Sequence, residues 1–166
     1  KSLVLSDTIQ QKQLILVCEH LLQVDRLFRC RRLLTMAHFE REIYRNPDQD
    51  LDKLWHDLNL KYMALNYDNE KCSGSWAANK FATSLACNTH NLVLADVFAA
   101  QLQHAIEKRV LRNGNYANNS AIGEYLENNL YKYGNAISWE KLIEKSTGEP
   151  LNTVYFVNYL VGEGYN

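Results

Sequence analysis

The shortage of turn-forming residues limits what this chain can fold into. Its 166 residues include only two prolines and seven glycines, whereas sheet-rich folds need such residues at frequent turns. Between the few breaks, apolar residues recur every three to five positions, which places them on one face of an α-helix. We find no strand-like alternation, internal repeat or low-complexity tract. The sequence therefore predicts an all-α fold of about seven helices, forming a single helical domain over residues 1–166.

Breaking and capping residues set the expected helix boundaries. Pro47 ends one helix, and Asp48 or Asp50 is expected to cap the next. Gly148 is expected to close a short helix that Ser138 caps. The stretch after residue 27 is apolar on nearly all sides, as expected of a central helix. The expected helices cover residues 9–28, 27–44, 51–65, 87–111 and 122–133, followed by two short helices capped by Ser138 and Asn152.

Charge and composition exclude several classes of function. Eighteen basic and nineteen acidic residues give a net charge of −1, so no cationic surplus favours nucleic acid as a partner. The longest apolar run, residues 91–100, is far shorter than the ~20 residues that a transmembrane helix needs. The four cysteines form no C-x-x-C pair, and we interpret them mostly as buried thiols.

No catalytic or metal-binding motif is complete in the sequence. His38 and Glu42 lie one helical turn apart, but a metallopeptidase helix needs H-E-x-x-H, which does not occur. We therefore interpret this pair as a packing or surface contact and predict no metal site. Cys87 and His90 lack an orienting third group and are interpreted as a core thiol and a helix-start imidazole. We predict no catalytic residue from these patterns.

Several segments together resemble the C-terminal third of helical zinc metallopeptidases. This group includes peptidyl-dipeptidases of the angiotensin-converting-enzyme type and thimet-like oligopeptidases, and the end of the chain also resembles helical carboxypeptidases of the same clan. The resemblance runs from about residue 27 to 160. The segments are HFER at 38–41, NPDQDL at 46–51, WAA at 76–78, FAAQL at 98–102 and KLIEKSTGEPLN at 141–152.

The resemblance implies a two-lobed helical molecule in which zinc is held by an upstream helix that is absent from this chain. We therefore expect no cofactor here, although zinc is expected in active relatives. The downstream lobe of such enzymes contributes a histidine and one or two tyrosines that donate hydrogen bonds to the tetrahedral intermediate. In this sequence the corresponding substrate-cleft positions are expected at Phe81, Asn88, Thr89 and Leu92, and none of them has the family's side chain. The chemistry therefore looks degenerate.

These observations leave three hypotheses. The first is a non-catalytic, peptidase-like helical domain that binds a peptide or protein, so that the chain by itself is not an enzyme. The second is a truncated C-terminal lobe of an active zinc-dependent peptidyl-dipeptidase or oligopeptidase, with H-E-x-x-H upstream. It predicts exposed apolar surface where the missing N-terminal lobe docks. The third is an unrelated helical interaction module.

Overall fold

The structure is a computed structural model that describes residues 8–66, 73–78, 87–112 and 115–162. All regular structure in this part of the chain is helical, which confirms the all-α prediction. None of its helices is long and apolar enough to cross a membrane. The α-helices are α1 (Thr8–Arg45), α2 (Leu51–Met63), α4 (Thr89–Ile106), α5 (Ser120–Asn129), α6 (Trp139–Thr147) and α7 (Val154–Val161), with short helical turns at η1 (Ser75–Ala78), η2 (Glu107–Leu111) and η3 (Tyr131–Tyr133).

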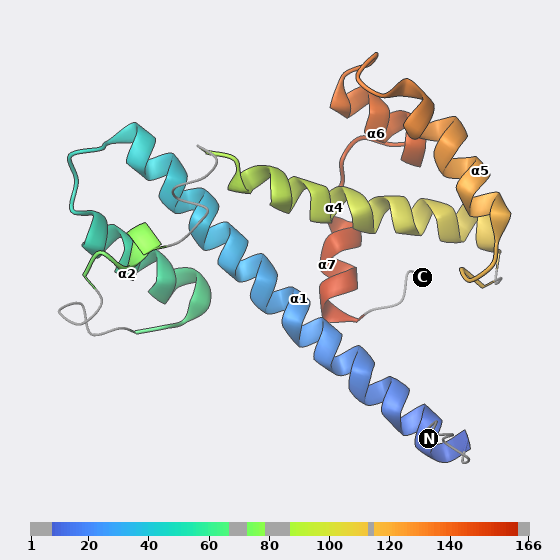
Figure 1. Ribbon diagram of the computed structural model, residues 1–166, viewed down its shortest axis with the longest axis horizontal. Coiled ribbons are helices and arrows are strands. Elements are labelled where there is room, and N and C mark those ends of the chain that lie inside the picture. Colours follow the sequence, from blue (N-terminus) through green and yellow to red (C-terminus); the bar gives the residue numbers. More distant parts are fainter. Residues whose placement is uncertain (1–7, 67–72, 79–86, 113–114, 163–166) are drawn as a thin grey trace. The chain divides into compact units, whose positions relative to one another are not determined.

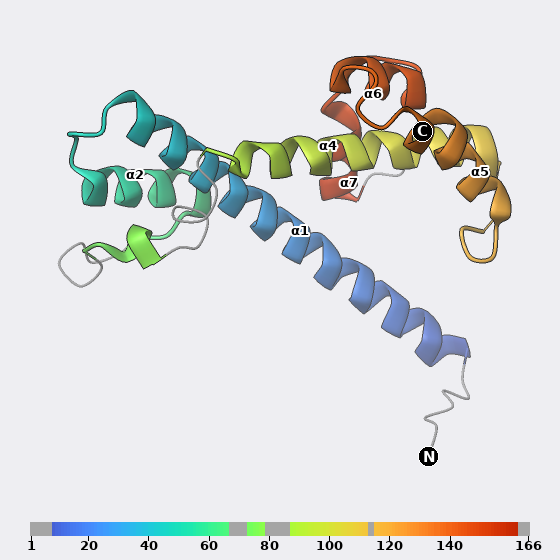
Figure 2. The ribbon, with the colours of Figure 1, turned by 45° about the horizontal axis from the view of Figure 1, so that its top comes forward.

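The chain forms two compact units, residues 1–92 and 93–166, and their boundary falls within α4. That the two units form a single domain over residues 1–166 stays a prediction. In the first unit, α2 lies beside the C-terminal half of α1 (Figure 1). In the second unit, α5 and α6 lie next to each other (Figure 2).

The helix α1 is continuous over 38 residues, so the prediction of two helices over 9–28 and 27–44 was wrong. The change in apolar pattern near residue 27 reflects a change in surroundings and leaves the backbone unbroken. No proline or glycine occurs between residues 8 and 45, so nothing interrupts the backbone hydrogen bonds. The helix ends before Pro47, as expected.

The core of the first unit surrounds Phe39, which is fully buried. Its ring contacts Trp55 of α2 edge-on, with centroids 5.1 Å apart, and Trp76 of η1 at 5.8 Å. Such aromatic contacts add to the free energy gained from burial of apolar area. Asp50 caps α2 as predicted, because its carboxylate accepts a hydrogen bond from the Lys53 backbone N–H at 2.9 Å.

Asp52 on α2 holds the segment that enters η1. Its carboxylate accepts hydrogen bonds from the Ser73 hydroxyl at 2.6 Å, the Gly74 N–H at 2.7 Å and the Trp76 indole N–H at 2.9 Å. These donors, the Ser73 hydroxyl above all, lower the pKa of Asp52 below its ordinary value of 3.8. Helical spacing alone would place Asp52 on the solvent-facing side of α2, whereas its carboxylate anchors Trp76 against Phe39.

The second unit is organised around Gln101 of α4, which is almost completely buried. Its Nε2 donates to Thr147 Oγ1 at 2.9 Å and to the backbone oxygen of Pro150 at 3.0 Å. Its Oε1 accepts from the Asn152 N–H at 2.8 Å. One amide therefore satisfies the polar groups of the turn between α6 and α7, which would otherwise be costly to bury.

Arg109 in η2 clamps the end of α6. Its Nη2 donates to the Thr147 backbone oxygen at 2.7 Å, and its Nη1 donates to the Tyr125 hydroxyl at 3.2 Å. Gly148 ends α6 with a φ of 96°, the left-handed conformation that favours glycine. A Cβ at this position would lie 2.1 Å from Arg109 Nη2. The prediction that Gly148 ends this helix is therefore confirmed. Its lack of a side chain also leaves space for the Arg109 guanidinium.

Four side-chain placements differ from the expectations. Cys18 is exposed, and Cys30 and Cys87 are only half-buried, so the interpretation of the cysteines as mostly buried was wrong for these three. Cys18 lies on a part of α1 that carries large apolar side chains in solvent. Trp139, the first residue of α6, is 53% exposed, although helical spacing alone would assign its ring to packing.

Substitution of Gly148 by alanine is expected to lower the free energy of unfolding by about 2–4 kcal/mol, because the new Cβ meets Arg109 and the backbone conformation is strained. Gly123, inside α5, has no neighbouring atom within 4 Å of the place that a Cβ would occupy. There, Gly123→Ala should instead stabilise by about 0.5–1 kcal/mol. Urea unfolding followed by circular dichroism measures both variants, and equal effects would contradict the clamp.

The bonds to Asp52 should make stability sensitive to acid. Because the folded-state pKa is lowered, the unfolded chain binds more protons, so this stabilisation is complete above pH 3.8 and is lost as pH falls through the folded-state pKa. The stability difference between the wild type and Asp52→Asn should therefore shrink at low pH. Urea unfolding at several pH values measures it. Asp48→Asn, at an exposed position, should show no such change.

Candidate functional site

The substrate-cleft positions implied by the family resemblance gather at the start of α4, as far as the structure describes them. Asn88, Thr89 and Leu92 occupy the first turn of this helix and the residue before it. Phe81 lies outside the described residues. The chain enters the helix through Cys87, whose φ of 51° is unusual for a residue other than glycine.

Thr89 is buried against a carboxylate from α1. Its backbone N–H donates to Glu40 Oε2 at 3.1 Å, and its hydroxyl donates to Glu40 Oε1. Thr89 is 2% exposed and Glu40 is 4% exposed. The first N–H groups of a helix have no partner within the helix, and the helix dipole favours a negative charge there. Glu40 therefore acts as the cap of α4 from a distant part of the chain.

The neighbouring positions are also engaged within the first unit. The Asn88 side-chain oxygen accepts a hydrogen bond from the Asn91 side-chain amide, and the Asn88 backbone oxygen accepts from the Asn91 N–H at 3.1 Å. Leu92 is half-buried and has no polar side-chain atom. His90 is exposed while Cys87 is half-buried. At this helix start, Thr89 is thus bonded to Glu40 and Asn88 is bonded to Asn91.

This arrangement limits the chemistry available at the start of α4. An oxyanion donor must point at the position where negative charge develops on the substrate. The two donors of Thr89 point at Glu40 instead, and Leu92 has none. Glu40 is an acceptor when ionised and cannot stabilise a second anion beside it. The described part of the site therefore supports helix capping.

His38 and Glu42, the pair considered in the sequence analysis, also have structural roles. The His38 ring stacks on Tyr62 of α2, with centroids 5.0 Å apart and 9° between the planes. Glu42 accepts from Arg41 at 2.8 Å. Burial, followed by the positive charges of Arg41 and Lys61, lowers the pKa of His38 below its ordinary value of 6.5.

Zinc is the cofactor implied by the resemblance, and the described residues do not fit it. A catalytic zinc site needs three protein ligands that converge on one point. In the part of the chain that the structure describes, no group of three or more histidine, cysteine, aspartate or glutamate side chains is placed to hold a metal ion. His38 and Glu42, which lie one helical turn apart, are bound to other side chains.

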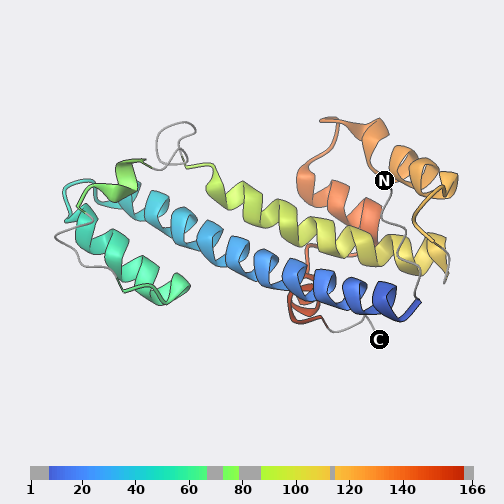
Figure 3. The same ribbon diagram turned by 60° about the horizontal axis from the view of Figure 1, so that its bottom comes forward.

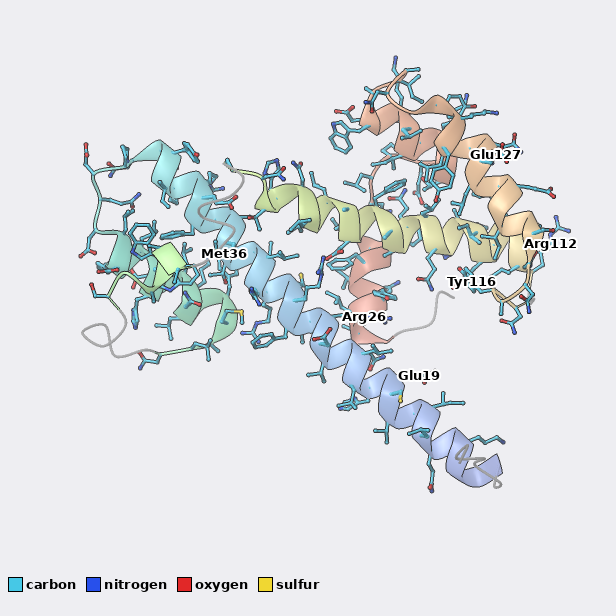
Figure 4. The ribbon with its side chains drawn as sticks, in the orientation of Figure 1. Glu19, Arg26, Met36, Arg112, Tyr116 and Glu127 are labelled. Atoms are coloured by element: carbon cyan, nitrogen blue, oxygen red, sulfur yellow. The ribbon has the colours of Figure 1, made fainter. Side chains whose placement is uncertain are left out.

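The second unit contains a pocket of about 440 Å³ between α4, α5 and η3. This volume is within the range of ~300–1,000 Å³ that is common for ligand sites. At one edge, Tyr116 donates towards the Gln103 backbone oxygen at 3.4 Å, and Gln103 Nε2 donates to Glu107 Oε1 at 2.9 Å. Figure 4 labels Tyr116 near the C-terminal end of the helical segment formed by α4 and η2. The lining residues are Ala99, Leu102, Gln103, Ile106, Tyr116, Leu126 and Tyr131.

Comparison with known proteins identifies no relative. No family model matches the chain, and neither a curated protein nor a solved structure matches it. The similarity to helical zinc peptidases therefore remains a hypothesis that rests on the short segments of sequence described above.

Sequence patterns did not identify the roles of two buried polar residues, Glu40 in the first unit and Gln101 in the second. Glu40 lies four residues after the buried Met36, and Gln101 lies four residues after the buried Val97, so each is a polar residue on an apolar helical face. That signal was present in the sequence. A polar residue on such a face must be hydrogen-bonded when it is buried, but the spacing does not identify the partner.

The hydroxyl of Thr89 should contribute measurably to stability. Thr89→Val keeps the shape but removes the donor to a charged, buried acceptor, which should cost about 1.5–3 kcal/mol. Thr89→Ser retains the hydroxyl and should recover most of this loss. The matched control is Thr153→Val, since Thr153 is exposed and its side chain does not cap α7. Urea unfolding measures all three, and an unchanged Thr89→Val would contradict the capping role.

Proposed function

We propose that this chain is a non-catalytic helical domain with a peptidase-like scaffold that binds a peptide or protein segment. The observation that carries the proposal is the burial of Thr89 against Glu40. At a position where the resemblance places a donor to the substrate, both donors of the residue are used inside the fold. Loss of one oxyanion donor typically lowers the rate ~100–1,000-fold, and the resemblance implies that more than one is replaced in this chain.

The pocket of the second unit supports the binding part of the proposal. Two tyrosines with substantial exposure, Tyr116 and Tyr131, stand at a pocket otherwise lined mainly by aliphatic side chains. Exposed tyrosines are enriched where proteins bind partners, because a large apolar ring and a polar hydroxyl are both available. The pocket would take one or two apolar side chains of an extended peptide, and the peptide class follows from the resemblance.

The proposal is tested by two measurements on the whole chain. Calorimetric titration with zinc, run beside an assay with quenched oligopeptides in the same buffers, should give neither stoichiometric metal binding nor cleavage. Fluorescence anisotropy with a library of labelled apolar peptides should then detect binding. Tyr131→Ser should weaken that binding about 10-fold. Tyr44→Ser should leave it unchanged, because Tyr44 is equally exposed but belongs to the first unit.

Each part of the proposal has an outcome that contradicts it. Metal-dependent cleavage by purified protein would overturn the non-catalytic assignment. Peptide binding that is insensitive to Tyr131→Ser would remove the pocket from the proposal. If no peptide binds, the peptide-binding part of the proposal is wrong and only a structural role is left for the domain.

A second candidate, the C-terminal lobe of a larger active peptidase, is favoured by one observation. Four consecutive residues of α1, Leu14 to Val17, are apolar and exposed by half or more, so apolar surface lies on several sides of the helix. Helices that are apolar all round are normally covered by other parts of a protein. An upstream coding segment with H-E-x-x-H would favour this candidate over the first.

A further inference from the structure

The first unit contains a pocket of its own, between α1 and α2, with a volume of about 210 Å³. Figure 3 shows the stretch of α1 along which α2 lies. On α1 the pocket is lined by Phe28, Arg32 and Thr35, which follow one another by four and three residues and therefore lie on one face of the helix. The pocket is thus built by a regular helical surface of α1.

The opposite wall comes from α2 and the residue just beyond its end. Trp55, Asn59 and Met63 recur every four residues along α2, and Leu65 follows the helix. Together with Phe28 of α1, the side chains of Trp55, Met63 and Leu65 give the pocket mainly apolar walls. Such walls contribute affinity for an apolar ligand through the area that they remove from water.

Two buried side chains add polar atoms to the lining. Thr35 and Asn59 are almost completely buried. The Thr35 hydroxyl donates to the Arg31 backbone oxygen at 3.0 Å, and Asn59 Nδ2 donates to the Trp55 backbone oxygen at 2.8 Å. These bonds use one donor of each side chain, whereas a hydroxyl oxygen and an amide oxygen can also accept. A few fixed polar groups in an apolar pocket are typical of small-molecule sites.

The third feature of the pocket is the positive charge of Arg32. Its side chain is exposed, and within the described ranges of both units its guanidinium forms no ion pair with a carboxylate. Two other arginines of the same helix, Arg41 and Arg45, pair with Glu42. The described lining of the pocket also contains no acidic side chain. An arginine fork with free donors binds a carboxylate through two parallel hydrogen bonds.

We propose that this pocket binds a small aromatic monocarboxylate. The ring lies between Trp55 and Met63, and the carboxylate binds the Arg32 guanidinium at the solvent side. An apolar cavity of about 150 Å³ can hold benzene, so the larger volume of this pocket suits a ring with a short carboxylate arm. The rings of Trp55 and Phe28 favour an aromatic body through edge and offset contacts. This site belongs to the first unit and does not depend on the proposed function.

The test is a titration of the full chain with phenylacetate, followed by the NMR signals of the tryptophan indole N–H groups. We expect a saturable shift of the Trp55 signal and none of the Trp139 signal, because Trp139 belongs to the second unit. Phenylacetamide has the same shape without the charge and should bind at least about 10-fold more weakly.

Charge and volume are tested by separate variants. Arg32→Gln should weaken phenylacetate binding about 10-fold or more and leave phenylacetamide binding unchanged. Arg45→Gln is the matched control, because Arg45 is an exposed arginine of the same helix outside the pocket. It should leave both ligands unaffected. Leu65→Trp fills the pocket from a position that is 37% exposed, so it should abolish binding of both ligands in a folded protein.

Several results would overturn the proposal. One is the absence of a saturable Trp55 shift at millimolar phenylacetate. Equal affinity for phenylacetate and phenylacetamide, or wild-type affinity in Arg32→Gln, would remove the role of the guanidinium. Binding that survives Leu65→Trp would place the ligand elsewhere. Circular dichroism of each variant checks that a loss of binding does not come from a loss of structure.

Discussion

A carboxylate from α1 determines how α4 begins. Glu40 is nearly buried, and burial of an unpaired charge is far more costly than burial of a charge that accepts hydrogen bonds. It accepts both the N–H and the hydroxyl of Thr89, and the unpaired N–H groups at the start of α4 favour its negative charge. The same side chain thus connects the long first helix to the segment that leads into the second unit. The first unit is held together by this polar contact as well as by the aromatic cluster around Phe39.

Helix-capping rules and helical periodicity predicted much of the fold, but they did not predict polar contacts between residues that lie far apart in the sequence. Asp50, Ser138 and Gly148 cap or end helices as predicted, because capping depends on residues within one turn. Asn152 also bonds the Val154 N–H, although α7 starts later than expected. Helical periodicity does not reveal that Glu40 meets Thr89, which lies 49 residues away. For the same reason, helical periodicity does not reveal that Asp52 accepts a hydrogen bond from Trp76.

The candidate site illustrates the same limit. The resemblance to zinc peptidases predicted substrate-binding donors near residues 88, 89 and 92, but it did not indicate what the residues at these positions do instead. The structure places Thr89 in a helix cap, a role that any helical fold can require. Thr89 is thus both a position where the resemblance predicts a substrate contact and a residue that the packing of α4 against Glu40 requires. The proposed loss of catalysis therefore has a physical counterpart in the hydrogen bonds of one threonine.

The apolar surface on the N-terminal half of α1 depends on that half being helical. Most of the stability of a helix in a protein comes from packing of its apolar face, because fixing the backbone costs conformational entropy that the helix's own hydrogen bonds barely offset. The half beside α2 supplies a nucleus, and helical turns propagate from Phe28 towards the N-terminus without a proline or glycine to stop them. Only while those turns are formed is there a continuous stripe of apolar side chains, at Leu14, Val17, Leu21, Val24 and Phe28. A partner that bound this stripe would therefore also stabilise the helical turns that carry it.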